Sequence, residues 1–229
     1  MIKAIVFDLD HTLYDRHKTL DLIVREHMSE RFELLKDVNE AVRIVKESDD
    51  HYAYFGWEAI YGHMVKCGLM DGTKYTHHDV KDFFWKYFAK IAVNFEGIEE
   101  MLSSLKSRGL KLGILTNGGH ELQSAKISLI GLEKYFDEIL ISWDTPYNKP
   151  EKEIFELMAD RLGVNTDETV YVGDAPLNDI HGSRSAGCIP AWVKTSGVWP
   201  KEFDCIEKPQ IVLEHLLDTE RVLLENGLI

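Results

Sequence analysis

The sequence predicts an α/β fold: a doubly wound parallel sheet as the core, with an all-helical cap domain inserted into it. Two observations carry this prediction. Short apolar runs rich in β-branched residues alternate with helical patterns along most of the chain, and one long stretch near the N-terminus shows helical spacing alone. At 229 residues the chain is long enough for a core of normal size and a smaller second domain.

Apolar runs predict the strands of the core. Residues 2–9 form a nearly continuous apolar run that ends in acids, as expected of a central parallel strand buried on both faces. Shorter runs follow at residues 110–115, 139–141, 169–172 and 190–193. Because crossovers between parallel strands are short and right-handed, all these strands point the same way and their C-terminal ends share one edge. Ligands bind along that edge in sheets of this type.

Helical patterns separate these strands. Two helices are predicted by apolar residues at helical spacing: Ile98, Met101, Leu102 and Leu105 in the first, and Ile154, Met158 and Leu162 in the second. Gly109 and Gly163 follow them as left-handed stops. A third helix is expected between Pro176, near its first turn, and Gly187, just past its end.

Between Tyr14 and Phe95 the alternation of strand and helix disappears. We therefore assign residues 15–94 to a helical cap domain, and residues 1–14 and 95–229 to a Rossmann-like catalytic core. Two apolar stripes at helical spacing predict cap helices: Leu20, Ile23, Val24, His27, Met28 and Leu35 in one, and Phe83, Phe84, Tyr87, Phe88 and Ile91 in the other.

Composition limits the partners. The 26 Lys and Arg residues against 39 Asp and Glu give a formal charge of -13, which argues against a nucleic acid polymer as partner. A small phosphorylated metabolite would need local positive charge from a divalent metal or a few placed cations. No apolar run reaches the roughly 20 residues of a membrane span, and the N-terminus lacks a signal peptide, so we expect a cytoplasmic protein without a membrane partner. The sequence leaves the oligomeric state open.

Two acids follow the first predicted strand. In an extended chain, Asp8 and Asp10 face the same side, so both carboxylates can reach one reacting centre. Paired acids tend to separate their pKa values, which leaves one ionised as a nucleophile and the other available as a proton donor. The alternative for this spacing alone is a solvated pair of acids after a strand.

The other strand ends carry phosphate-binding and metal-binding types of residue. Thr116, Asn117 and Gly118 offer a hydroxyl, an amide and backbone N–H groups to phosphate oxygens, although a turn and helix cap would use the same residues. Lys149 can offset charge on a nucleophile and on a transferring phosphoryl group. Asp174 and Asp179 add hard oxygen ligands of the kind that suits Mg²⁺. Asp179 could bind through water or position Lys149; its alternative is an acid that stabilises a helix N-terminus.

Together these segments resemble the four motifs of the haloacid dehalogenase superfamily, and the helical insertion is similar to its first cap type. The resemblance implies that Asp8 attacks phosphorus to form an aspartyl-phosphate, and that Asp10 protonates the leaving alcohol and then activates water. It also implies that Thr116 and Asn117 hold phosphoryl oxygens while Lys149 balances charge. Mg²⁺ would be bound by the Asp8 carboxylate, the Asp10 carbonyl and Asp174. The family often has Gly where this chain has His11, which we interpret as a packing residue.

The resemblance favours a phosphatase of small phosphomonoesters, because Asp10 supplies the proton donor that dehalogenases and phosphonatases typically lack. A sugar phosphomutase with the same core is the alternative among enzymes. An inactive binding or regulatory protein is the alternative of another class. Cap residues that could line a substrate pocket favour nucleoside monophosphates over sugar phosphates; the alternative is that these residues form the core of the cap. They are His17, Arg25, His51, Tyr52, Tyr54, Trp57, Tyr61 and His63.

Overall fold

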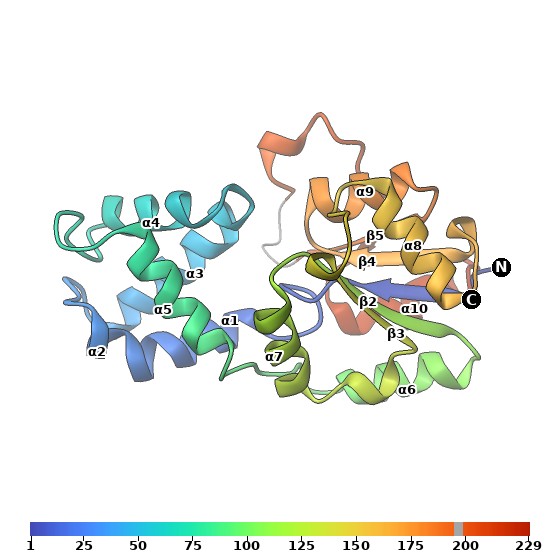
Figure 1. The fold of residues 1–229 in the computed structure, drawn as a ribbon, viewed down its shortest axis with the longest axis horizontal. Helices are drawn as coiled ribbons and strands as arrows, with labels where there is room; N and C mark the ends of the chain where they lie inside the picture. The colour runs from blue at the N-terminus through green and yellow to red at the C-terminus, as the bar shows by residue number, and fades with distance from the viewer. Residues whose placement is uncertain (195–198) are drawn as a thin grey trace. The chain divides into compact units, whose positions relative to one another are not determined.

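The computed structural model describes residues 1–194 and 199–229. Contacts between Cα atoms divide the chain into two compact units. One unit comprises Met1–Tyr14 and Asn94–Ile229, and the other comprises Asp15–Val93 (Figure 1). We call them the core unit and the helical unit.

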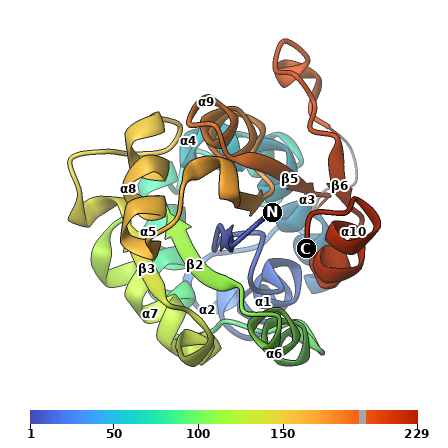
Figure 2. The same cartoon turned by 90° about the vertical axis from the view of Figure 1, so that its right-hand side faces the viewer.

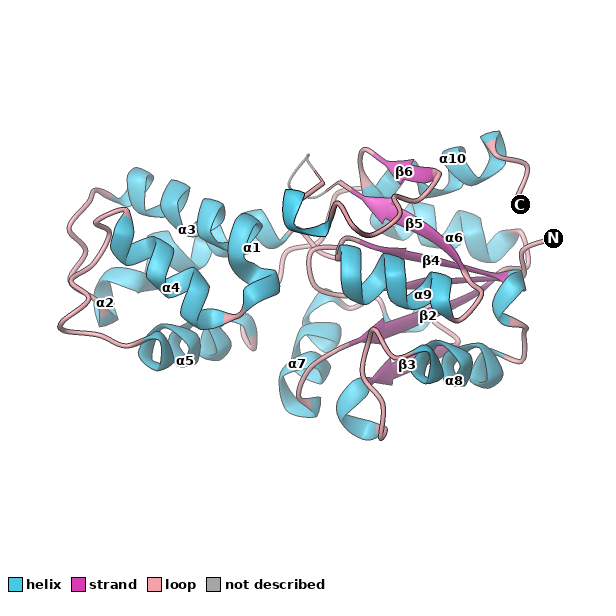
Figure 3. Cartoon of the chain, turned by 90° about the horizontal axis from the view of Figure 1, so that it is seen from above, coloured by secondary structure: helices cyan, strands magenta, loops and turns pink. Residues whose placement is uncertain are grey.

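A parallel sheet forms the centre of the core unit. In the described residues it has six strands: β1 (Ala4–Phe7), β2 (Lys111–Thr116), β3 (Glu138–Ile141), β4 (Thr169–Gly173), β5 (Ile189–Val193) and β6 (Ile211–Leu213). Their order is β3-β2-β1-β4-β5-β6, and every neighbouring pair is parallel (Figure 3). The predicted fold class is confirmed. Strand β6 was not predicted, because three residues are too few to show a period.

β1 occupies the middle of the sheet because its side chains are apolar on both faces. All four of its residues are buried, and it pairs with β2 on one side and β4 on the other. The strand ends at Phe7, opposite Val172 of β4, and the Asp8 N–H continues the ladder to the Val172 carbonyl at 2.9 Å. The first acid of the chain is thereby held at the end of β4 by backbone hydrogen bonds.

Helices cover both faces of this sheet. They are α6 (Ile98–Ser107), α7 (His120–Ile130), α8 (Lys152–Leu162), α9 (Gly182–Ser185) and α10 (Thr219–Glu225). Figure 2 shows α8 and α9 together on one face and α6 and α10 together on the other. The apolar residues of α8 pack against β1, β2 and β4 in one buried cluster. This two-sided burial explains why the core strands read as continuous apolar runs.

The predicted helix ends are mostly reproduced. Gly109 and Gly163 take the left-handed conformation expected after α6 and α8, with φ of 80° and 65°. The helix predicted between Pro176 and Gly187 begins as a π-helical turn, Pro176–His181, and only then continues as α9. Such turns are often found at functional sites.

The helical unit contains α1 (Arg16–Ile23), α2 (Ser29–Arg31), α3 (Val38–Tyr52), α4 (Trp57–Lys66) and α5 (His77–Phe88). Both predicted stripes supply buried residues: Leu20, Ile23, Val24, Met28, Phe83, Phe84 and Phe88. The first predicted stripe includes one residue too many, because the backbone becomes extended at Phe32 and Leu35 is exposed. Ile91 likewise lies beyond the end of α5. Among the described residues, no helix combines the length and apolar character that crossing a membrane requires.

Candidate active site

Three buried acids of the core unit lie close together where β1 and β4 are neighbours in the sheet. The connections from β1 and from β4 run to opposite sides of the sheet, which makes this pair the topological switch point where doubly wound sheets bind ligands. Asp8 follows β1, while Asp174 and Asp179 follow β4, and all three are buried. One carboxylate oxygen from each lies within 4.8 Å of the others, so this cluster could hold a metal ion. Buried hard oxygens are the ligands that Mg²⁺ prefers.

Lys149 lies inside this cluster. Its Nζ donates to Asp8 Oδ1 at 2.6 Å, to Asp179 Oδ1 at 2.7 Å and to the Tyr171 hydroxyl at 3.0 Å. Burial opposes the charge, but the Asp179 and Asp8 carboxylates outweigh it and hold the pKa of Lys149 well above its ordinary value. The side chain is therefore a permanent ammonium that contacts the first acid of the chain.

Asp8 has an unusual proton affinity. Burial raises its pKa from 3.8 to about 8; Lys149 opposes this shift, and the negative charges of Asp179 and Asp174 add to it. Burial of this carboxylate near two other acids thus outweighs the stabilising effect of Lys149 on its charge. A divalent cation among these oxygens would offset the repulsion between these acids, which is a physical reason to expect one here.

Asp179 is fixed by its own contacts. Its Oδ2 accepts the Ala175 N–H at 2.9 Å, and its Oδ1 accepts from Lys149 and, at 3.3 Å, from the Tyr171 hydroxyl. Gly173 makes this possible, because a Cβ there would lie 2.4 Å from Asp179 Oδ2. Since both carboxylate oxygens have partners within the protein, the geometry favours Asp179 as the residue that positions Lys149.

Tyr171 and Trp192 contact the cluster from strands β4 and β5, and neither was predicted to have a role. Burial raises the pKa of Tyr171 well above its ordinary value, so the side chain is a neutral phenol that also donates to the Leu115 carbonyl at 3.0 Å. The Trp192 indole donates to the Asp174 carbonyl at 2.9 Å. Both residues sit in apolar strand patterns, where nothing in the sequence separates them from ordinary core residues.

The Asn117 side chain contacts the backbone of Lys149. Its side chain donates to the Lys149 carbonyl and accepts the Lys149 N–H, both at 2.9 Å. The Gly118 N–H donates to the Ser142 hydroxyl at 3.2 Å. These contacts tie the end of β2 to the loop that carries Lys149. The Thr116 hydroxyl instead accepts a hydrogen bond from Gln123 Nε2 of α7 at 2.5 Å.

Asp10 is part of a second polar group. Its carboxylate accepts from the Tyr14 hydroxyl at 2.6 Å, from Lys126 at 2.8 Å to each oxygen, and from Gln123 at 3.1 Å. None of these three partners was predicted from the sequence. Gln123 and Lys126 lie one turn apart on α7 and are buried polar residues in a helix, but no motif marks them.

His11 occupies a left-handed backbone position, with φ of 60°. This conformation is costly for residues other than glycine, which accounts for the glycine that the resemblance led us to expect here. The chain reverses direction at His11 between the two acids and Leu13, which is fully buried.

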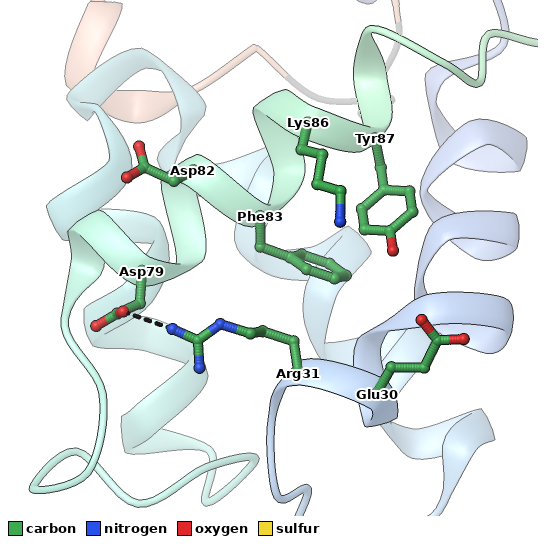
Figure 4. A pocket seen from close by; sticks show the side chains of 7 residues that line it. All are labelled: Glu30, Arg31, Asp79, Asp82, Phe83, Lys86 and Tyr87. Atoms are coloured by element: carbon green, nitrogen blue, oxygen red, sulfur yellow. Dashed lines mark hydrogen bonds and ion pairs between the residues drawn. The ribbon is translucent and has the colours of Figure 1, made fainter.

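The helical unit has a pocket of its own, about 360 Å³ in volume. In Figure 4 the Arg31 side chain extends towards Asp79, to which it is ion-paired at 2.8 Å, and Phe83 forms an apolar wall. Among the residues considered as pocket lining, Trp57 stacks on Phe84, and Tyr52 stacks on His63. These contacts favour the interpretation of that stripe as internal packing.

Buried acids and a lysine at the switch point of a doubly wound sheet thus form a polar cluster that could hold a metal ion. A family model described as haloacid dehalogenase-like hydrolase matches residues 5–193. The chain belongs to this family, and the prediction that it is a hydrolase of the superfamily is confirmed.

Curated relatives are phosphatases by name. A glyceraldehyde 3-phosphate phosphatase of Methanocaldococcus jannaschii is 30% identical over 202 residues, which cover 82% of this chain and 83% of the relative. An N-acylneuraminate-9-phosphatase of Rattus norvegicus is 29% identical over 87% of this chain and 85% of its own. Among solved structures, the putative hydrolase YfnB of Bacillus subtilis, bound to magnesium, has a TM-score of 0.72 at 21% identity and covers 97% of this chain and 98% of its own. At that identity the likeness concerns the fold.

Proposed function

We propose that this chain is a Mg²⁺-dependent phosphatase that hydrolyses small phosphomonoesters through an aspartyl-phosphate on Asp8. The observation that carries the proposal is the contact of the Asp8 carboxylate with the Lys149 ammonium, beside Asp174 and Asp179 in one buried cluster. Phosphoryl transfer requires an oxygen nucleophile held among positive charges, because both the nucleophile and the phosphoryl group are anionic.

Mg²⁺ would be held by the Asp8 carboxylate, the Asp10 backbone carbonyl and the Asp174 carboxylate. When bound, the ion supplies positive charge to the phosphoryl oxygens and to the nucleophile. Asp179 serves the site through Lys149, since both of its oxygens are engaged within the protein. The fit rests on the donor set, which consists of buried carboxylates with one ammonium to balance them.

The reaction has two steps. An Asp8 oxygen attacks phosphorus, the bond from phosphorus to the ester oxygen breaks, and Asp10 gives its proton to that departing oxygen. Asp10, now a carboxylate, takes a proton from water as the water oxygen attacks phosphorus, which releases inorganic phosphate and restores Asp8. In this proposal, Thr116 and backbone N–H groups at the start of α7, His120–Ile130, hold the phosphoryl oxygens.

Phosphorylated sugars and related small metabolites are the proposed substrates. The named substrates of the relatives are a triose phosphate and a phosphorylated sugar acid. The names of these relatives favour sugar phosphates over the nucleoside monophosphates that the cap residues suggested.

The test is release of inorganic phosphate from a panel of sugar, triose and nucleoside phosphates, with and without Mg²⁺. We expect Mg²⁺-dependent release that Asp8→Asn abolishes, and no loss in Asp160→Asn, which removes one negative charge from an exposed position on α8. A substrate consumed by isomerisation without phosphate release would indicate a phosphomutase. No turnover in the wild type, or equal turnover in Asp8→Asn, would indicate a binding protein that has kept the fold.

A further inference from the structure

Helix α7 presents two buried polar side chains to the proposed catalytic residues. Gln123 and Lys126 are 2% and 4% exposed, although a helix that only packs on a sheet needs apolar residues there. The Lys126 Nζ lies 2.8 Å from each oxygen of Asp10 and 2.9 Å from Gln123 Oε1. An ammonium out of water costs several kcal/mol unless it is paired in good geometry.

Gln123 extends this contact to the strand that carries Thr116. Its Nε2 donates to Thr116 Oγ1 at 2.5 Å and to Asp10 Oδ2 at 3.1 Å. The Tyr14 hydroxyl approaches Asp10 Oδ1 at 2.6 Å. The Asp10 side chain remains 29% exposed, so these partners hold it without closing it off.

We propose that Lys126 is a positioning residue for Asp10, and that Gln123 couples the same carboxyl group to Thr116. The inference rests on the proposed phosphatase function, in which Asp10 transfers a proton to the departing ester oxygen. When one oxygen of Asp10 carries that proton, the other still accepts from Lys126, so the carboxyl group cannot rotate away. As the bond from phosphorus breaks, its electron pair stays on the ester oxygen, the proton moves there, and Lys126 stabilises the carboxylate that remains.

The test compares two substrates of similar shape. Phenyl phosphate has a poorer leaving group than p-nitrophenyl phosphate, so its cleavage depends more on proton donation. The value of kcat/KM covers the steps up to release of the alcohol, which is where Asp10 acts as an acid. We expect Lys126→Met to lower kcat/KM for phenyl phosphate about 10-fold more than for p-nitrophenyl phosphate, since acid–base groups typically contribute 10²–10⁴-fold. Lys126→Arg should restore part of the difference.

The control is Ile127→Ala on the same helix, which removes buried apolar contacts without touching Asp10. It should lower thermal stability and leave the ratio between the two substrates at the wild-type value. If Lys126→Met does not fold, Lys126→Gln gives the same comparison with a side chain that still forms hydrogen bonds. Equal losses on both substrates, in either variant, would overturn the positioning role. A wild type that releases phosphate from neither substrate would instead refute the proposed function.

Discussion

Lys149 is the residue on which the proposed site depends most. Its ammonium lies between Asp8 and Asp179 and is 5% exposed, so its removal leaves the buried acids without their nearest counter-charge. We expect Lys149→Met to lower phosphatase activity at least 100-fold and to destabilise the metal-free protein by about 3–5 kcal/mol. Phosphate release and urea unfolding measure the two effects.

The control for this change is Lys134→Met, which removes an ammonium from an exposed pair with Glu99. Exposed pairs contribute at most about 1 kcal/mol, so neither quantity should change much. Activity retained in Lys149→Met would show that the lysine serves folding and not phosphoryl transfer.

Asp8 predicts a pH dependence of stability in the absence of metal. Its folded-state pKa of about 8 lies above the ordinary 3.8, so the folded protein binds this proton more tightly than the unfolded chain. The resulting stabilisation is complete below pH 4 and is lost as pH rises towards 8, with a slope of at most about 1.4 kcal/mol per pH unit. Asp8→Asn cannot titrate, so its stability relative to wild type should rise between pH 5 and 8 in EDTA. Parallel curves for the two proteins would contradict the raised pKa.

Single residues differed in how well the sequence identified them. Asp8, Lys149 and Asp174 could be predicted because each follows an apolar strand, and strand ends of a parallel sheet converge. Lys126 and Tyr171 could not, since a lysine on a helix and a tyrosine in a strand are usually unrelated to a site. Their contacts form only once the chain has folded.

At the scale of elements, β4 and the π-helical turn after it together fix the position of the Asp179 side chain. The turn brings the Asp179 carboxylate back over Gly173, and a Cβ at that glycine would lie 2.4 Å from Oδ2. We expect Gly173→Ala to displace Asp179 and with it Lys149, which should lower kcat at least 10-fold and stability by about 1–3 kcal/mol. Steady-state kinetics and thermal unfolding test this.

A matched substitution is Gly62→Ala in α4, where no atom lies within 4 Å of the added Cβ. Alanine is the better helix former by about 1 kcal/mol, so this variant should be slightly more stable and equally active. If Gly173→Ala behaved in the same way, the close approach of Asp179 would have no functional importance.

Elements were predicted where a period extended over enough residues. Strands β1, β2 and β4 are clear apolar runs because both of their faces are buried. Helix α8 has a clear helical pattern because one long stripe of its residues is buried. β6 is too short for that test. The prediction that the first apolar stripe reaches Leu35 is wrong for a different reason. The backbone becomes extended at Phe32, and apolar periodicity alone does not mark the end of the helix there.

At the scale of the whole molecule, metal binding and folding should be linked. The acids that would hold the ion follow β1 and β4, which are far apart in sequence, so the unfolded chain has no comparable site. A ligand at 100 times its Kd then stabilises the folded state by about 2.7 kcal/mol. For a chain of this size that corresponds to roughly 5–10 °C in Tm. We expect this upward shift when Mg²⁺ is added to EDTA-treated protein, and its loss in Asp174→Asn. The variant Asp160→Asn, with the same change in charge at the surface, should shift as the wild type does. An equal shift in Asp174→Asn would mean that Mg²⁺ acts elsewhere on this acidic chain, and the metal site proposed between β1 and β4 would then be wrong.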